Sequence, residues 1–157
     1  MEMRITKNTG KPHIILYERN NGSHTWMYAD GFFVMHDLSH YALEKKLDYK
    51  TGFMGMLNGG MDIKDFEDSE KRKKMIVTKE GAYAENMANL FLIETHQGNF
   101  EDFNSVSKQA FESTWKNFPS PDLSDEDIDT VRNYLKKLLK EWDQLPVGKT
   151  MILKFEI

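Results

Sequence analysis

Two histidines four residues apart, His36 and His40, are the side chains whose type and spacing point most directly to chemistry. In a helix they would lie roughly 40° apart on one face, one turn above the other. Two imidazoles at this spacing can bind a single metal ion, as they do in H-E-x-x-H helices. The segment therefore predicts a divalent-metal site, with Zn²⁺ as the ion that fits best.

Two carboxylates lie close to this pair in the sequence. Asp37 occupies the position at which zinc peptidases carry a glutamate as general base, but it is one methylene shorter. At the start of a helix, Asp37 would also cap free N–H groups. Glu44 lies one turn beyond His40, about 80° from His36, at the edge of the same face. We take Asp37 or Glu44 as the acid–base or orienting carboxylate.

A further ligand must come from elsewhere in the chain. The predicted helix over 81–97 has a narrow polar stripe in which Glu85 and His96 fall within about 40° of one another. Packed against the histidine helix, this stripe would add Glu85 or His96 to the two histidines. Turned toward solvent, it is an ordinary exposed face, and both interpretations remain open. His24 is a more distant candidate ligand.

The elements that must position these residues begin with strands. Asn21-Gly22 is a strong hairpin signal, because a type I′ turn needs positive φ at both central residues. With a two-residue loop, Tyr17 lies opposite Trp26, and Ile15 lies opposite Tyr28. This pairing places an aromatic patch on one face of the sheet, which other elements must cover. The strands are predicted over Met3–Lys7, His13–Arg19, Ser23–Tyr28 and, at the other end of the chain, Thr150–Ile157.

Between these strands the chain has helical periodicity. Four long helices and one short connection with a helical turn are predicted, over Phe33–Leu47, Thr51–Gly60 (the connection), Gly81–Gln97, Phe100–Phe118 and Asp125–Leu145. The charged stretch Asp62–Lys74 ends in four basic residues. It is taken as a solvated loop or exposed helix, because the adjacent acids cancel its field.

The last predicted helix, 125–145, has apolar residues at steps of three and four. This stripe could form the seam of a homodimer or pack on the domain's own core. We favour internal packing, because the stripe is barely three heptads long and the sheet needs to be covered.

Composition narrows the class of protein. The 157 residues are 29% charged, carry a net charge of −4 and contain no cysteine. Disulfides and thiolate metal sites are therefore excluded, and the negative charge disfavours nucleic acid as a partner. No apolar run is long enough for a membrane helix, and Met1–Lys7 has no leader character, so a cytoplasmic location is expected. No nucleotide or flavin motif is present.

Two neighbouring segments resemble a group of small bacterial proteins of unestablished function. They are His36-Asp37-Leu38-Ser39-His40-Tyr41-Ala42-Leu43-Glu44 and the Gly52–Gly59 segment that follows it. These proteins share an H-D-L-x-H-Y-x-x-E helix, a hairpin turn before T-W, and a W-x-x-L-P sequence before a last strand. The corresponding residues here are Thr25-Trp26 and Trp142–Pro146. The resemblance implies that the histidine helix is the working part of the protein.

Together these observations predict a single α+β domain over 1–157, with a small antiparallel sheet covered by about four helices. The first functional hypothesis is a bacterial cytosolic protein with a divalent-metal site, acting as a metal-dependent hydrolase. The second is a non-enzymatic domain that binds a small molecule or a protein. In that case the histidine pair forms a buried hydrogen-bond network, because a buried polar group without a partner costs about 1–3 kcal/mol.

Overall fold

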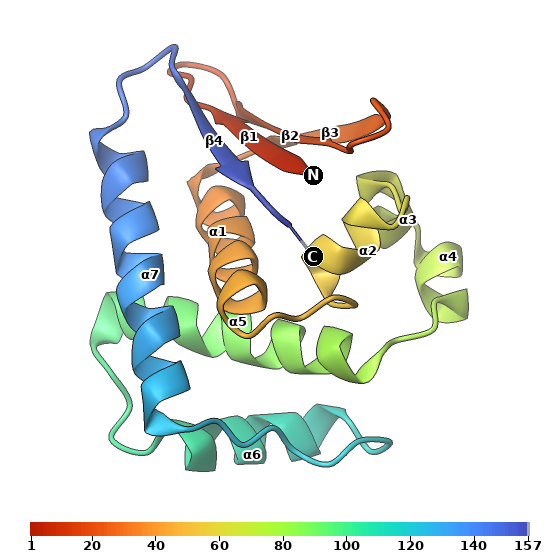
Figure 1. The fold of residues 1–157 in the computed structure, drawn as a ribbon, viewed down its shortest axis with the longest axis vertical. Helices are drawn as coiled ribbons and strands as arrows, with labels where there is room; N and C mark the ends of the chain where they lie inside the picture. Colours follow the sequence, from red (N-terminus) through yellow and green to blue (C-terminus); the bar gives the residue numbers. More distant parts are fainter. Residues whose placement is uncertain (157) are drawn as a thin grey trace.

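A four-stranded antiparallel sheet forms one layer of the structure, and the helices pack against one of its faces (Figure 1). The computed structural model describes residues 1–156, so Ile157, the last residue of the predicted C-terminal strand, lies outside the described residues. The strands are β1 (Glu2–Thr6), β2 (His13–Glu18), β3 (His24–Ala29) and β4 (Thr150–Lys154). Their order is β3-β2-β1-β4, so the C-terminal strand joins the sheet of the N-terminal hairpin, as predicted.

Seven helices lie within the described residues, and the predicted α+β class is confirmed. The four long helices are those that the periodicity indicates. The three short helices α2, α3 and α4 lie where a connection and a charged loop or exposed helix are expected. The helices are α1 (Gly31–Lys46), α2 (Phe53–Asn58), α3 (Ile63–Glu67), α4 (Ser69–Lys74), α5 (Lys79–Gln97), α6 (Phe103–Thr114) and α7 (Asp125–Gln144).

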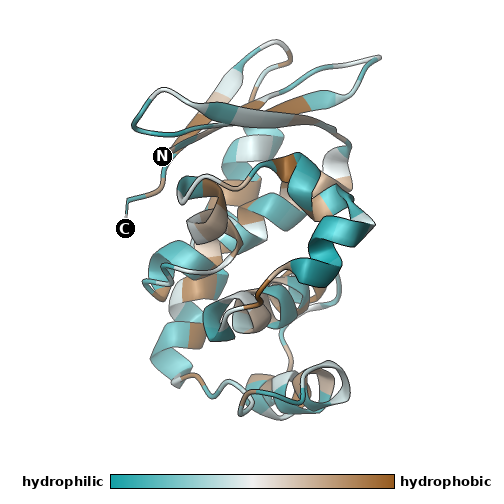
Figure 2. Cartoon of the chain, turned by 90° about the vertical axis from the view of Figure 1, so that its right-hand side faces the viewer, coloured by the Kyte–Doolittle hydropathy of each residue, from teal (hydrophilic) through white to brown (hydrophobic). Residues whose placement is uncertain are grey.

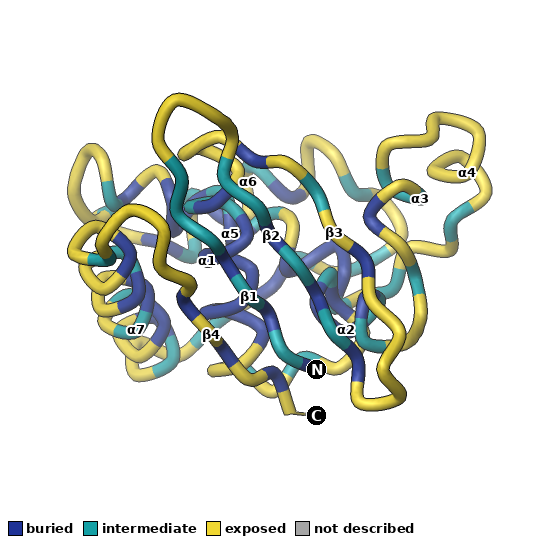
Figure 3. The backbone as a smooth tube through the Cα atoms, turned by 90° about the horizontal axis from the view of Figure 1, so that it is seen from above, coloured by how far each residue is buried: buried dark blue, intermediate teal, exposed yellow. Residues whose placement is uncertain are grey.

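The inner face of the sheet forms one wall of the core. Buried and more exposed residues alternate along each strand, which Figure 3 shows from the outer side of the sheet. The buried side chains on this face include Met3, Ile5, Ile15, Tyr17 and Leu153.

The hairpin loop between β2 and β3 has three residues, Asn20–Gly22, where two are predicted. The N–H of Arg19 donates to the carbonyl of Ser23 (2.8 Å), and Gly22 has a φ of 83°. A three-residue loop with its last residue in the left-handed region is a common alternative to the two-residue turn. Both loops use an Asn-Gly pair, so the sequence signal is the same.

This extra loop residue shifts the hairpin register by one, and the predicted pairing was wrong. Tyr17 pairs with Thr25, and Ile15 pairs with Met27. A shift of one residue turns every side chain of a strand to the other face. Trp26 and Tyr28 therefore point outward and are 46% and 63% exposed.

Helix α1 lies at the centre, in contact with the sheet, α5 and α7. Every residue from Asp37 to Glu44 is buried, so this stretch is enclosed on all sides. The helix begins at Gly31, two residues before the predicted start, because Asp30 caps it by accepting the N–H of Phe33 (3.0 Å). The first turn is exposed, and the histidine segment lies in the enclosed part that follows.

Helix α7 covers the side of α1 that faces away from α2 (Figure 1). Its apolar stripe is buried in the chain's own core, which is the interpretation that the sequence favours: Ile128, Val131, Leu135, Leu138 and Trp142. A buried ion pair between Arg132 and Glu94 (2.6 Å) ties α7 to α5.

Candidate metal centre

His36 and His40 lie one above the other on α1, as their spacing predicts. The centroids of their rings are 4.7 Å apart. The His36 side chain is 20% exposed and stacks beside Phe32, whereas His40 is only 1% exposed and contacts Phe53. The pair therefore runs from the partly exposed part of α1 into the protein interior.

Glu44 lies behind His40, and its side chain is completely buried. One carboxylate oxygen lies 3.2 Å from Nδ1 of His40. The other accepts the backbone N–H groups of Met54 (2.9 Å) and Gly55 (3.4 Å) at the start of α2. Glu44 thus orients the imidazole and satisfies free amides of a second helix at the same time.

Two glycines make room for this arrangement. A Cβ atom on Gly52 would lie 2.5 Å from the carboxyl carbon of Glu44. A Cβ on Gly55 would lie 2.1 Å from the carbonyl oxygen of Lys50. The start of α2 can therefore approach Glu44 only because both positions lack a side chain.

Asp37 has the corresponding position behind His36. Its Oδ1 lies 3.4 Å from Nδ1 of His36, and its Oδ2 accepts the hydroxyl of Tyr17. Burial and the neighbouring carboxylates Asp37 and Glu44 raise the pKa of Tyr17, so its hydroxyl stays a proton donor. The prediction that Asp37 caps the helix start was wrong, because the helix begins six residues earlier and Asp30 caps it.

Glu85 reaches the histidines from α5, so its stripe faces α1 rather than solvent alone. Its Oε2 lies 3.5 Å from Nε2 of His40, and its Oε1 accepts the side-chain amide of Asn89 (3.1 Å). The Glu85 side chain is 56% exposed. One ligand atom each from His36, His40 and Glu85 lies within 4.8 Å of the other two.

The charges in this group are strongly coupled. Burial alone lowers the pKa of His40, but the hydrogen bond to Glu44, the contact with Glu85 and the attraction of both carboxylates outweigh burial and raise it to about 9. The close contact with His40 lowers the pKa of Glu85 to about 2 against the opposing effect of burial. Without a metal, His40 is therefore held as a cation between two carboxylates at neutral pH.

Nε2 of His40 is nevertheless buried without a hydrogen bond of good geometry among the described residues. It lies 3.5 Å from Oε2 of Glu85. Two ligand atoms of a tetrahedral zinc ion are separated by a similar distance, about 3.4 Å. The imidazoles of His36 and His40 and the carboxylate of Glu85 form a donor set that could hold a divalent metal. Each imidazole has a further carboxylate at its Nδ1.

A cavity of about 420 Å³ opens beside this group. His40 and Glu85 form its polar end. Most of its wall is apolar and comes from α2, α3, the connection between α4 and α5, and the end of α6: Phe53, Met56, Phe66, Met75, Val77 and Trp115. Arg72 of α4 also lines the cavity. A molecule in the cavity would therefore lie next to the candidate ligands.

The remaining predicted site residues lie elsewhere. His96 is exposed, three turns and about 16 Å along α5 from Glu85, and does not join the group. His24 pairs with Glu18 at the exposed end of the hairpin. Asp37 and Glu44 lie behind the imidazoles and do not line the cavity.

Sequence reasoning missed Tyr17 as the partner of Asp37 and missed both Arg72 and Trp115 as cavity residues. For Tyr17, the sequence predicts the covered face of the sheet, as the structure has it, but does not indicate that Asp37 of α1 meets it there. Arg72 lies in a run of four basic residues, and nothing in the run distinguishes it.

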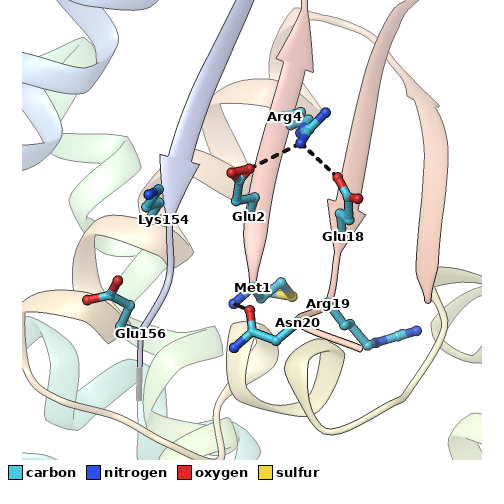
Figure 4. A pocket seen from close by; sticks show the side chains of 8 residues that line it. All are labelled: Met1, Glu2, Arg4, Glu18, Arg19, Asn20, Lys154 and Glu156. Atoms are coloured by element: carbon cyan, nitrogen blue, oxygen red, sulfur yellow. Dashed lines mark hydrogen bonds and ion pairs between the residues drawn. The ribbon is translucent and has the colours of Figure 1, made fainter. Parts of the chain in front are cut away.

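A second hollow lies at the end of the sheet, where Met1, Asn20 and Glu156 meet (Figure 4). Its main charged groups pair with one another: Arg4 binds Glu2 (3.2 Å) and Glu18 (2.8 Å). This hollow has no group of potential metal ligands among the described residues. The cavity beside His40 is therefore the better candidate for a functional site.

Comparison with known proteins gives no match to a family model, a curated protein or a solved structure. Within residues 1–156, no helix combines the length and the apolar character that crossing a membrane requires. The functional conclusion must therefore come from the geometry of the site.

Proposed function

We propose that the protein binds one divalent metal ion through His36, His40 and Glu85 and uses it to hydrolyse a small molecule held in the adjoining cavity. One observation carries this proposal: Nε2 of His40 is buried without a hydrogen bond and faces Glu85, while Glu44 lies at Nδ1 of the same ring. Glu85 offers this nitrogen only an ion-pair contact at 3.5 Å without a hydrogen bond of good geometry, and a metal ion between the two groups would give both a closer partner.

The donor types favour Zn²⁺ over Mg²⁺ or Ca²⁺. Imidazole nitrogen suits zinc, iron, nickel and copper, whereas magnesium and calcium prefer oxygen ligands. Three protein ligands are also the usual number in catalytic zinc sites, which leave a coordination position for water or substrate. When bound, such an ion polarises a carbonyl group and lowers the pKa of water.

The protein's own residues divide the remaining work. Glu44 and Asp37 each lie at Nδ1 of one imidazole, and in His40 this leaves Nε2 facing Glu85. Both carboxylates are buried on the far side of the rings from the cavity, so we assign them orienting roles rather than acid–base roles. Glu85 is the one carboxylate that lines the cavity within the described residues.

A second function is supported by the charge state of His40. With a pKa of about 9, its ring is an imidazolium that Glu44 and Glu85 neutralise without any metal. In this alternative the cluster is a structural ion pair that joins α1, α2 and α5. The domain would then bind a ligand or a protein without catalysing a reaction.

Metal analysis of protein purified without a polyhistidine tag separates the two functions. The metal proposal expects close to one equivalent of a transition metal, lost on substitution of His40→Asn and on acidification. His96→Asn is the matched control, because it removes an exposed histidine of α5 outside the group. Sub-stoichiometric zinc, manganese, nickel and iron, with no rise in melting temperature when any of them is added, would leave the structural alternative.

A further inference from the structure

The charges that line the cavity beside His40 are unevenly placed. Its wall is mostly apolar and aromatic, with Phe53, Phe66 and Trp115 as its largest side chains. Glu85 and His40 form one polar end, and Arg72 is the one further charged residue of the lining. A bound molecule would therefore meet the candidate metal ligands, an apolar surface and a single guanidinium group.

Arg72 differs from the basic residues on either side of it. Lys71 pairs with Asp65 (2.6 Å), and Lys73 pairs with Glu70 (2.8 Å). Arg72 belongs to the same short helix but makes no ion pair within residues 1–156. Figure 2 shows this helix, α4, coloured teal on the side of the molecule that faces the viewer. The guanidinium of Arg72 is thus free to bind an anion from outside the chain.

We infer that the cavity takes a small carboxylic acid derivative with an apolar, aromatic-sized body, whose carboxylate binds Arg72. This inference rests on the proposed function, because it names the substrate class of the same site. A planar guanidinium matches a carboxylate with two parallel hydrogen bonds. The body would lie against Phe53, Phe66 and Trp115, with the bond to be hydrolysed near His40 and Glu85.

A carboxylate suits the cavity better than a phosphate monoester does. Such a phosphate carries nearly two negative charges at neutral pH, whereas Arg72 is the only positive side chain of the wall apart from His40 at the candidate centre. In the metal-free protein, Glu85 would also repel a dianion more strongly than a monoanion. One free cation in an otherwise apolar wall therefore matches one negative charge.

Binding of 3-phenylpropionate tests this inference by isothermal titration calorimetry, with the neutral 3-phenylpropanamide and 2-phenylethyl phosphate as comparison compounds. Both the metal-free and the zinc-loaded protein are titrated. We expect the acid to bind about tenfold or more tightly than the amide, because charge-assisted hydrogen bonds are about twice as strong as neutral ones. We also expect the acid to bind the metal-free protein more tightly than the phosphate does.

Substitutions in α4 locate the effect. Arg72→Gln should weaken binding of the acid about tenfold and leave binding of the amide unchanged. Lys74→Gln is the matched control, because it removes the same charge from the same helix at a residue that does not line the cavity. The affinity of this variant for the acid should stay within about twofold of the wild type, since Lys74 lies outside the cavity and solvent and salt screen its charge.

The outcomes separate this inference from the metal proposal. If zinc does not bind but the acid binds metal-free protein with the expected dependence on Arg72, the hydrolase proposal fails and the ligand class stands. If zinc binds but Arg72→Gln and Lys74→Gln weaken the acid equally or not at all, the ligand class is wrong and the metal site stands. Equal affinities for acid and amide, tighter binding of the phosphate to the metal-free protein, or no binding of any probe would overturn the inference.

Discussion

The carboxylate of Glu44 lies 3.2 Å from Nδ1 of His40, and neither side chain is more than 1% exposed. This contact joins the deepest candidate ligand to the start of α2, because the second oxygen of Glu44 accepts amides of that helix. The orientation of the imidazole and the position of α2 therefore depend on one side chain.

Substitution of Glu44 should separate these two roles. Glu44→Gln keeps the volume and an acceptor for the α2 amides but removes the charge at Nδ1 of His40. We expect a folded protein whose affinity for Zn²⁺ falls about 10- to 100-fold, measured by competition with a chromogenic chelator. Glu44→Ala leaves the α2 amides without an acceptor and should lower the free energy of unfolding by about 1–3 kcal/mol. An unchanged zinc affinity in Glu44→Gln would show that Glu44 is purely structural.

Glu85 should matter for metal binding and little for folding. Its side chain is more than half exposed, so Glu85→Gln should change the melting temperature of the metal-free protein by no more than a few degrees. Loss of a charged ligand should abolish the rise in melting temperature that zinc produces in the wild type. Glu112→Gln, at an exposed position of α6, is the control. A zinc-induced rise that persists in Glu85→Gln would exclude Glu85 as a ligand.

The metal-free protein should lose stability at high pH. The folded-state pKa of His40 is raised to about 9, above its ordinary value of 6.5. Its contribution is therefore fully present below pH 6.5 and is lost as the pH rises through 9. Urea unfolding of wild type and His40→Asn in the presence of a chelator should give a stability difference that shrinks from pH 6.5 to 9.5.

Zinc affinity should change in the opposite direction over the same range. An ion can bind Nε2 only after the imidazolium has lost its proton, so affinity should rise with pH up to about 9. If the urea experiment gave a stability difference that does not depend on pH, and zinc affinity were also constant, His40 would titrate near its ordinary pKa.

The two glycines before and within α2 should respond differently to alanine. Gly55→Ala places a methyl group against the backbone of Lys50 and should destabilise the fold by about 1–3 kcal/mol. Gly52→Ala meets the Glu44 carboxylate instead, so we expect a marked loss of zinc affinity as well. In Gly59→Ala the nearest atom is 3.3 Å away, and this variant is the control in urea unfolding and zinc titration. Equal effects at all three glycines would contradict the close approach of α2 to Glu44.

The stripe on α7 should be essential for folding. Leu135 is 1% exposed and packs in the core, so Leu135→Asp buries an unpaired charge and should unfold the protein, as seen by circular dichroism. Lys136→Asp, one residue further on the exposed face, should stay folded. A folded, monomeric Leu135→Asp variant of a dimeric wild type would instead identify the stripe as a dimer seam.

The sequence predicts the parts of this structure that depend on local spacing. The four-residue interval of His36 and His40 places them on one face of any regular helix, and the structure has them there. The long helices and the presence of a C-terminal strand also follow from periodicity. These features require no knowledge of how distant segments pack.

The features that sequence reasoning missed depend on such packing. Tyr17 lies on the covered face of the sheet, as predicted, but the pattern of its strand does not reveal that Asp37 lies opposite its hydroxyl. Helix α5 is apolar around most of its circumference, so Glu85 could as well have faced solvent. Asp37 is buried because the central part of α1 is enclosed on all sides and Tyr17 of β2 meets its carboxylate, which spacing within the helix does not reveal.

Hydrogen bonds at the start of α5 bear on which ions the site would accept. Oε2 of Glu80 accepts the amides of Lys50 (2.8 Å) and Thr51 (2.7 Å), and the Thr51 carbonyl accepts the hydroxyl of Thr78 (2.7 Å). These bonds fasten α5 to the segment after α1 only five residues before Glu85. The span between His40 and Glu85 is thus set by the protein before an ion arrives. A site with a preset span discriminates by ionic radius and coordination number, which places the larger Ca²⁺, with its six to eight ligands, at a disadvantage.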